Sequence, residues 1–141
     1  MHNFTVALRI YGQSLNIEKV SQDLKTIPTQ ARLTGERRSE NSKWNESMWE
    51  WEACPRDGGH WPSLETGLSA LMEAFASQQE KLQQYRNKHS VVSWCGHSSS
   101  SFDGGPRFSV GLLRALADFG VELFIDTYFP SETANQGPKL G

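Results

Sequence analysis

Residues 96–107 contain the side chains that come nearest to a catalytic set. An imidazole at His97, a carboxylate at Asp103 and the hydroxyls of residues 98–101 would supply a base, an orienting acid and a nucleophile for hydrolysis. Arg107 adds a cation that could hold an anionic ligand. The segment has no Gly-x-Ser-x-Gly arrangement, and its glycine and serine content predicts a flexible loop. His97, Asp103 and Arg107 are therefore candidates for a ligand-binding loop, and no catalytic residue is assigned.

Two cysteines and two histidines raise a different chemistry, a tetrahedral zinc site. Cys54 precedes His60 and Cys95 precedes His97, and two thiolates with two imidazoles suit Zn²⁺. The spacings C-x5-H and C-x-H are not those of the usual zinc fingers or ribbons. The sequence therefore favours reduced, free thiols, with no metal site and no cofactor.

A basic stretch with one tryptophan could attract phosphates and stack a single-stranded base. Glu36 and Glu40 lie inside the same stretch and cancel much of its positive potential. We therefore expect residues 37–43 to form a solvated, mobile loop, and a nucleic-acid partner is disfavoured. The residues of this stretch are Arg32, Arg37, Arg38, Lys43 and Trp44.

Residues 44–52 place three tryptophans among three glutamates and predict a strand. Alternation puts Trp49 and Trp51 on one side, where large aromatic residues fill a core. Tryptophan with acidic neighbours on the other side is typical of a surface that binds a basic protein. We therefore expect Glu50 and Glu52 to be exposed, so that reversing both charges changes the free energy of unfolding by only about half a kcal/mol.

Two further acidic residues lie near the end of the chain. Glu122 and Asp126 are four positions apart and share one face of an expected strand, with Phe124 between them. This arrangement favours an open surface of the sheet over a general acid/base pair. The candidate partner-binding residues are Trp44, Glu46, Glu50, Glu52, Glu122 and Asp126.

Hydrophobic periodicity predicts the elements that position these side chains. The order through residue 95 is the split β-α-β pattern of a ferredoxin-like fold, and an additional C-terminal helix and strand follow. The fold class is α+β, with the helices on one face of the sheet. The expected strands span residues 4–11, 30–36, 44–53, 90–95 and 121–128, and the expected helices span residues 16–27, 62–85 and 109–119. The expected core consists of Val6, Leu8, Ile10, Leu68, Leu71, Phe75, Val91, Leu116, Leu123 and Ile125.

The composition is that of one ordinary globular domain. The chain has 141 residues, 37% hydrophobic and 21% charged, with 14 Lys+Arg against 16 Asp+Glu. This near-neutral balance argues against general affinity for nucleic acid or anionic membranes. No apolar run is long enough to span a membrane, and no signal peptide is recognised, so we expect a cytoplasmic protein. We expect a single α+β domain over residues 1–130 and a flexible tail over 131–141.

Four short markers, in this order along the chain, resemble those of a known family. They are Ile27-Pro28-Thr29, Gly35-Glu36, the strand with Trp49 and Trp51, and the segment GVELFID at residues 120–126. From about Phe4 to Tyr128 the chain resembles the bacterial family catalogued as domain of unknown function 4279. The resemblance implies an α+β cytoplasmic domain of bacterial origin, without established catalytic residues. Proteins of this size and build are also similar to immunity proteins of bacterial toxin systems.

Together these observations favour a non-catalytic cytoplasmic domain that binds a protein partner. The most concrete form is an immunity-type inhibitor that covers a toxin with its sheet face and residues 44–52. The alternative is a small-molecule-binding domain or an enzyme that uses residues 96–107. A neighbouring gene for a secreted toxin would favour the first hypothesis, and the sequence leaves the oligomeric state open.

Overall fold

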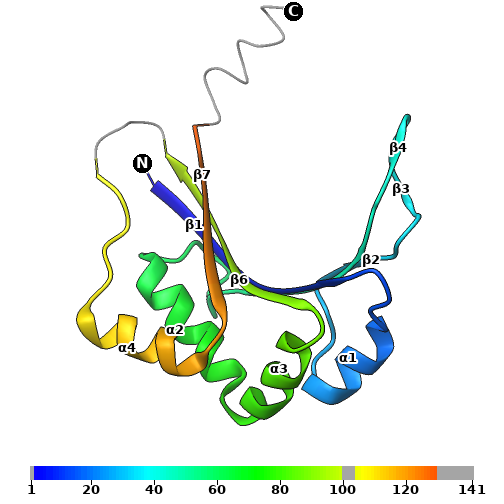
Figure 1. Cartoon of the computed structure of the whole chain (residues 1–141). Coiled ribbons are helices and arrows are strands. Elements are labelled where there is room, and N and C mark those ends of the chain that lie inside the picture. Colours follow the sequence, from blue (N-terminus) through cyan, green and yellow to red (C-terminus); the bar gives the residue numbers. More distant parts are fainter. Residues whose placement is uncertain (1, 100–103, 130–141) are drawn as a thin grey trace, which may run out of the picture.

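Five of the described strands form one curved sheet, and the helices lie on one side of it (Figure 1). The computed structural model describes residues 2–99 and 104–129. The strands are β1 (His2–Gly12), β2 (Gln30–Arg32), β3 (Arg37–Ser39), β4 (Ser42–Lys43), β5 (Ser47–Ala53), β6 (Ser90–Ser99) and β7 (Glu122–Tyr128). Within the described residues, one sheet has the order β2-β5-β1-β6-β7, and β3 and β4 form a separate two-stranded ribbon.

Three of the described helices begin at a side chain that accepts a hydrogen bond from a free backbone N–H group. Asn16, Ser63 and Ser109 each accept a bond from the N–H three residues further on. The helices are α1 (Ile17–Leu24), α2 (Leu64–Ala74), the short 3-10 helix η1 (Ala76–Gln78), α3 (Gln79–Arg86) and α4 (Val110–Phe119). The chain therefore has an α+β fold.

The central strand β1 separates two faces with different chemistry. Val6, Leu8 and Ile10 point toward the helices and are each 0% exposed. Because successive side chains of a strand alternate, Arg9 and Tyr11 point to the opposite side. We call the side that carries Arg9 and Tyr11 the open face, since none of the described helices covers it (Figure 1).

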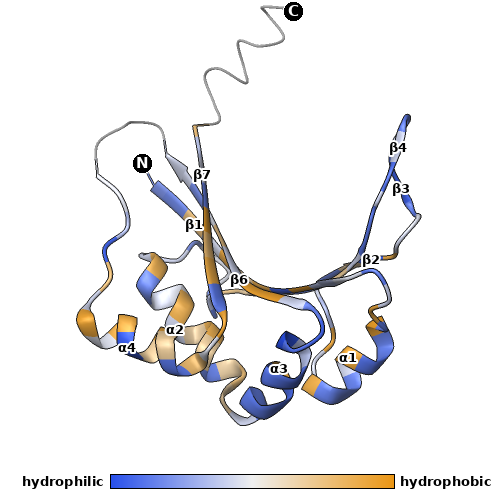
Figure 2. Ribbon diagram, in the orientation of Figure 1, coloured by the Kyte–Doolittle hydropathy of each residue, from blue (hydrophilic) through white to orange (hydrophobic). Residues whose placement is uncertain are grey.

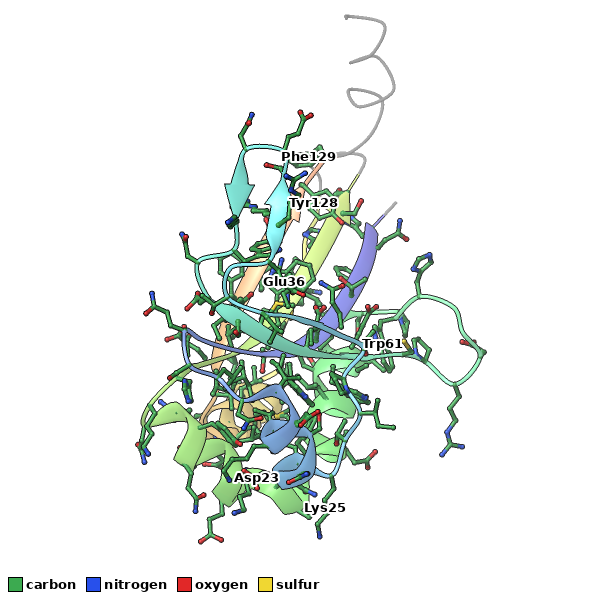
Figure 3. All side chains as sticks on the ribbon, turned by 90° about the vertical axis from the view of Figure 1, so that its right-hand side faces the viewer. Asp23, Lys25, Glu36, Trp61, Tyr128 and Phe129 are labelled. Carbon is green, nitrogen blue, oxygen red and sulfur yellow. The ribbon has the colours of Figure 1, made fainter. Side chains whose placement is uncertain are left out.

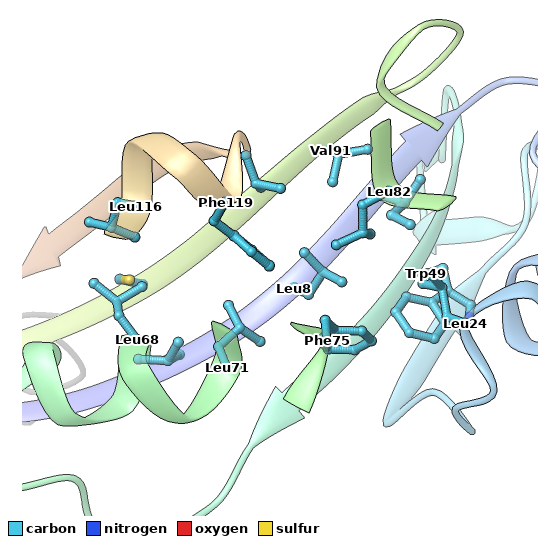
Figure 4. Packing of buried hydrophobic residues seen from close by; sticks show 14 of the residues in the cluster. Leu8, Leu24, Trp49, Leu68, Leu71, Phe75, Leu82, Val91, Leu116 and Phe119 are labelled. Atoms are coloured by element: carbon cyan, nitrogen blue, oxygen red, sulfur yellow. The ribbon is translucent and has the colours of Figure 1, made fainter. Parts of the chain in front are cut away.

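The predicted core is confirmed. Side chains of the sheet and of α2, α3 and α4 pack into one cluster (Figure 4). Leu123 and Ile125 lie at its margin and are half-buried. The other members of the predicted set are buried within it: Val6, Leu8, Ile10, Leu68, Leu71, Phe75, Val91 and Leu116.

Residues 37–43 form the ribbon of β3 and β4 in place of the expected loop. Arg37 pairs with Lys43, and backbone bonds of 2.9 Å link Gly35 and Glu36 to Trp44. The ribbon is largely hydrophilic (Figure 2). It rises at one end of the open face, opposite the end of β7 (Figure 1). Backbone pairing between two short polar segments thus extends the connection from β2 to β5.

The helix expected over residues 62–85 is divided into α2 and α3. Phe75 departs from helical geometry, with φ −111° and ψ 17°, and the turn η1 follows it. Phe75 and Leu82 are nevertheless both buried in the core. The break therefore lets two short helices, rather than one straight rod, keep their apolar residues against a curved sheet.

Strand β6 continues to Ser99, beyond the strand end expected at residue 95. The first residues of β1 pair with this extension on one side, where His2 lies opposite Ser99. Strand β7 runs parallel to it on the other side, where Tyr128 lies opposite Ser98. Because both edges have backbone partners, pairing outweighs the low strand propensity of a segment rich in serine and glycine.

No helix within the described ranges is long and apolar enough to cross a membrane. The predicted tail, residues 131–141, lies outside the described residues.

We predict that Leu71→Ala and Phe75→Ala each lower the free energy of unfolding by about 2–5 kcal/mol, because each deletes a buried side chain beneath the sheet. Chemical denaturation measures the loss. Leu113→Ala is the matched control, because Leu113 lies in α4 and is 50% exposed; it should change stability by about half a kcal/mol. Equal effects of the three variants would contradict the packing of α2 on the sheet.

Candidate functional site

The open face is built from side chains that the strand register brings into rows. Arg9 of β1 lies between Glu50 of β5 and Val92 of β6. In the next row Ala7 lies between Glu52 and Trp94, and Phe124 of β7 follows Trp94. A partner approaching this face therefore meets side chains from four neighbouring strands at once.

Arg9 is the centre of this face. Its Nε donates to a carboxylate oxygen of Glu50 at 2.9 Å, and its Nη1 donates to the Tyr11 hydroxyl at 3.1 Å. Its guanidinium also lies over the ring of Trp94, 4.0 Å from the ring centroid. Burial alone would lower the pKa of Arg9, but the bonds to Glu50 and Tyr11 outweigh it and raise the pKa. Arg9 is thus a charged group held firmly in one position.

Glu50 requires a correction. The alternation of β5 does place it on the open face, but it is only 7% exposed. Arg9 and its neighbours cover the carboxylate, so Glu50 is a structural ion-pair partner rather than an exposed contact. The expectation that Glu50 is exposed is therefore wrong. A strand pattern specifies which face a residue takes, whereas its exposure depends on the neighbouring strands.

Glu52 remains half-buried on the same face, opposite Ala7. Its pKa is raised, mainly by burial and also by the charge of Glu50. Glu46 precedes β5 and is exposed. Of the predicted glutamates of this segment, Glu46 and Glu52 are thus the ones with surface left for a partner.

Trp44 is half-buried where the ribbon joins β5, and two arginines stack on it. The guanidinium carbons of Arg32 and Arg38 lie 3.5 and 4.8 Å from the centroid of its ring. Arg32 Nη2 donates to Met48 Sδ at 2.8 Å, and Arg32 Nε is buried without a hydrogen-bond partner. Burial lowers the pKa of Arg32. The sequence placed these residues in one stretch, but only the fold turns them toward the open face.

Strand β7 forms the other end of the open face. Glu122 and Asp126 are exposed there, as predicted, opposite Val92 and Gly96. Phe124 lies between them on the same face and is 51% exposed. Tyr128 ends the strand, and Tyr128 and Phe129 both lie at the top of the view in Figure 3, away from the helices at the bottom. This edge therefore combines acidic groups with exposed aromatic rings.

Trp94 is a residue of this face that the sequence analysis missed. A Cβ at Gly96 would lie 2.9 Å from its ring, so glycine is needed for the ring to lie along β6. Arg9 covers the same ring from β1. Arg9, which the sequence analysis also left out, did have a signal in the sequence. It is the one charged residue in a largely apolar expected strand, and a charge there must face away from the core.

Of the predicted ligand-loop residues, the structure describes His97 and Arg107. His97 lies in β6, is 4% exposed and shares a face with the core residue Cys95. It makes hydrogen bonds with His2 at 2.8 Å and Thr127 at 3.3 Å. Burial, and then the charge of His2, lower the pKa of His97. Arg107 is exposed before α4, and Asp103 lies outside the described residues.

The two Cys–His pairs of the zinc hypothesis lie in different parts of the fold, Cys95 and His97 in β6 and Cys54 and His60 beside β5 and α2. Cys95 is buried in the core, where burial raises the pKa of its thiol to about 12. Cys54 is exposed and lines, with His60 and Trp61, a shallow hollow of about 670 Å³ beside β5 and α2. Within the described residues, no three His, Cys, Asp or Glu side chains are placed to hold one metal ion.

A comparison with models of known protein families shows the family to which the chain belongs. The family described as "Domain of unknown function (DUF4279)" matches residues 2–130. The chain belongs to this family. No curated protein and no solved structure matches this DUF4279 domain. The resemblance noted in the sequence is therefore confirmed.

We predict that Glu50→Lys lowers the free energy of unfolding by roughly 2–3 kcal/mol, because it leaves Arg9 without its partner and adds a like charge beside it. Glu52→Lys, on the same strand and face, should cost less than about 1 kcal/mol. Thermal and chemical denaturation of the two variants provide the comparison. A small, equal loss in both would show that the Arg9–Glu50 pair contributes nothing to stability.

The burial of His97 makes the stability of the fold depend on pH. Because the pKa of His97 is lowered in the folded protein, the unfolded chain binds more protons below about pH 6.5, and the free energy of unfolding falls as the pH falls. In His97→Asn this fall should be smaller. Identical pH dependence in this variant and in the wild type would contradict the effect of burial on His97.

Proposed function

We propose that this DUF4279 domain is a non-catalytic protein-binding domain that uses its open face, most concretely as an immunity-type inhibitor of a bacterial toxin. The observation that carries the proposal is the open face itself. It presents exposed aromatic rings and fixed charges on a curved surface that no described helix covers. Surfaces with these properties are typical of protein interfaces.

The residue types support this proposal. Tryptophan, tyrosine and arginine dominate the energetics of protein interfaces. Arg9 and Trp94 stack at the centre of the open face, and Trp44 stacks with Arg32 where the ribbon joins β5. The ion pair and stacking around Arg9 hold its side chain in position before a partner arrives. Such preorganisation lowers the entropy that binding must overcome. An inhibitor of this kind would act by covering the functional surface of its target.

The proposed setting is the bacterial cytoplasm. The resemblance to a bacterial family supports the origin, and two free cysteines suit a reducing compartment. We also propose that the first part of the sheet is ferredoxin-like. The antiparallel order β2-β5-β1-β6, with α1 following β1 and α2 and α3 following β5, supports this topology.

The alternative, a small-molecule-binding domain or an enzyme, remains a prediction. His97 lies in β6 and not in a loop, which weakens the original argument from residues 96–107. The hollow lined by Cys54, His60 and Trp61 is a different place where a small ligand would fit.

For a toxin whose gene neighbours this one, we predict that Phe124→Glu weakens binding by on the order of tenfold or more, because it removes an exposed aromatic contact of the open face. Isothermal titration with the purified toxin measures the affinity. Leu113→Glu is the matched control: Leu113 is 50% exposed and Phe124 51%, but Leu113 lies in the helix layer.

A greater loss of affinity in Leu113→Glu than in Phe124→Glu would move the interface to the helices. No binding of the wild-type domain to any co-purified protein, together with a neighbouring metabolic operon, would overturn the inhibitor proposal.

A further inference from the structure

Arg32, Trp44 and Arg38, which we call the arginine–tryptophan cluster, carry positive charge that the described chain does not neutralise. In the part that the structure describes, the ion pairs are Arg9–Glu50 and Lys19–Asp23. Neither arginine of the cluster takes part in them. The cluster therefore differs from Arg9, whose charge is balanced by a carboxylate on the same face.

Arg32 shows most clearly that an acceptor is missing. It is half-buried, and among the described residues its hydrogen bond goes to the weak acceptor Met48 Sδ. Its Nε is buried and has no hydrogen-bond partner within that part of the chain. A guanidinium has five N–H donors, and leaving a partly desolvated one without an anion costs free energy. An external acceptor would recover that cost.

We propose that the arginine–tryptophan cluster binds carboxylate side chains of an acidic segment in the partner protein. This inference rests on the proposed function and specifies the chemistry of the partner at one end of the open face. The planar guanidinium groups suit carboxylates, and their stacking on Trp44 restricts their motion. The sequence alone had favoured a basic partner, because Glu50 was expected to be exposed.

A protein carboxylate fits better than a nucleic acid. The open face also carries the unpaired carboxylates Glu52, Glu122 and Asp126 among the described residues, and these would repel an extended phosphate backbone. The indole of Trp44 is already in contact with two guanidinium groups, so little of it remains for a nucleobase. A segment with a few acidic side chains at the ribbon end avoids both difficulties.

Titration of the full chain with a short fluorescein-labelled glutamate-rich peptide at low ionic strength tests the proposal, with fluorescence anisotropy as the readout. We expect the wild-type chain to bind it, and Arg38→Ala to weaken binding by about fivefold. Arg37→Ala is the matched control. Arg37 is the neighbouring exposed residue of β3, and its backbone lies opposite that of Lys43 across the ribbon. Because Arg37 is not part of the arginine–tryptophan cluster, its removal should leave the affinity near that of the wild type.

Two further titrations separate the other occupants. A lysine-rich peptide should bind less tightly than the glutamate-rich peptide, and so should a labelled oligothymidylate. The proposal is overturned if the glutamate-rich peptide does not bind, if Arg37→Ala and Arg38→Ala lose affinity equally, or if the oligothymidylate binds more tightly. Because the peptide replaces the natural partner, these outcomes are independent of whether the toxin itself binds.

Discussion

The rest of the structure depends on the position of β1 in the centre of the sheet. Its neighbours β5 and β6 pair with its two edges, so every side chain of β1 points to one face of the sheet or the other. Leu8 and its apolar neighbours anchor the helices on one side, and Arg9 organises the side chains on the other. The core and the open face are therefore two consequences of one alternating strand.

The open face contains charged groups in two physical states. Arg9 has a carboxylate, a hydroxyl and an aromatic ring around it, so its charge is satisfied within the chain. Arg32 contacts an aromatic ring and a sulfur atom, and within the described residues it forms no ion pair with a carboxylate. The first arrangement stabilises the sheet, and the second provides unsatisfied donors for a partner. Arg9, at the centre of the open face, thus has a structural role. For Arg32, at the ribbon end of the same face, we propose a role in binding.

Much of the fold could be predicted, because local periodicity and burial agree in it. The apolar alternation of β1 and the apolar stripe of α2 led to the core that the structure shows. The predictions fail where pairing with distant strands outweighs the local propensity of a segment. Ser98 and Ser99 have weak strand propensity, yet β6 continues through them because β1 and β7 supply backbone partners that no local pattern reveals.

The sequence by itself determined which residues face the core and which do not, because strand alternation and helix periodicity are properties of consecutive residues. It also contained the family relationship. Only the tertiary structure decided which outward residues are accessible. Glu50 became nearly buried when β1 placed Arg9 beside it, and Arg32 and Arg38 came together on Trp44 through the pairing of β2 with β5 and the folding of the ribbon. Exposure and charge balance are sums over neighbours from distant parts of the chain, so they exist only after the strands have paired.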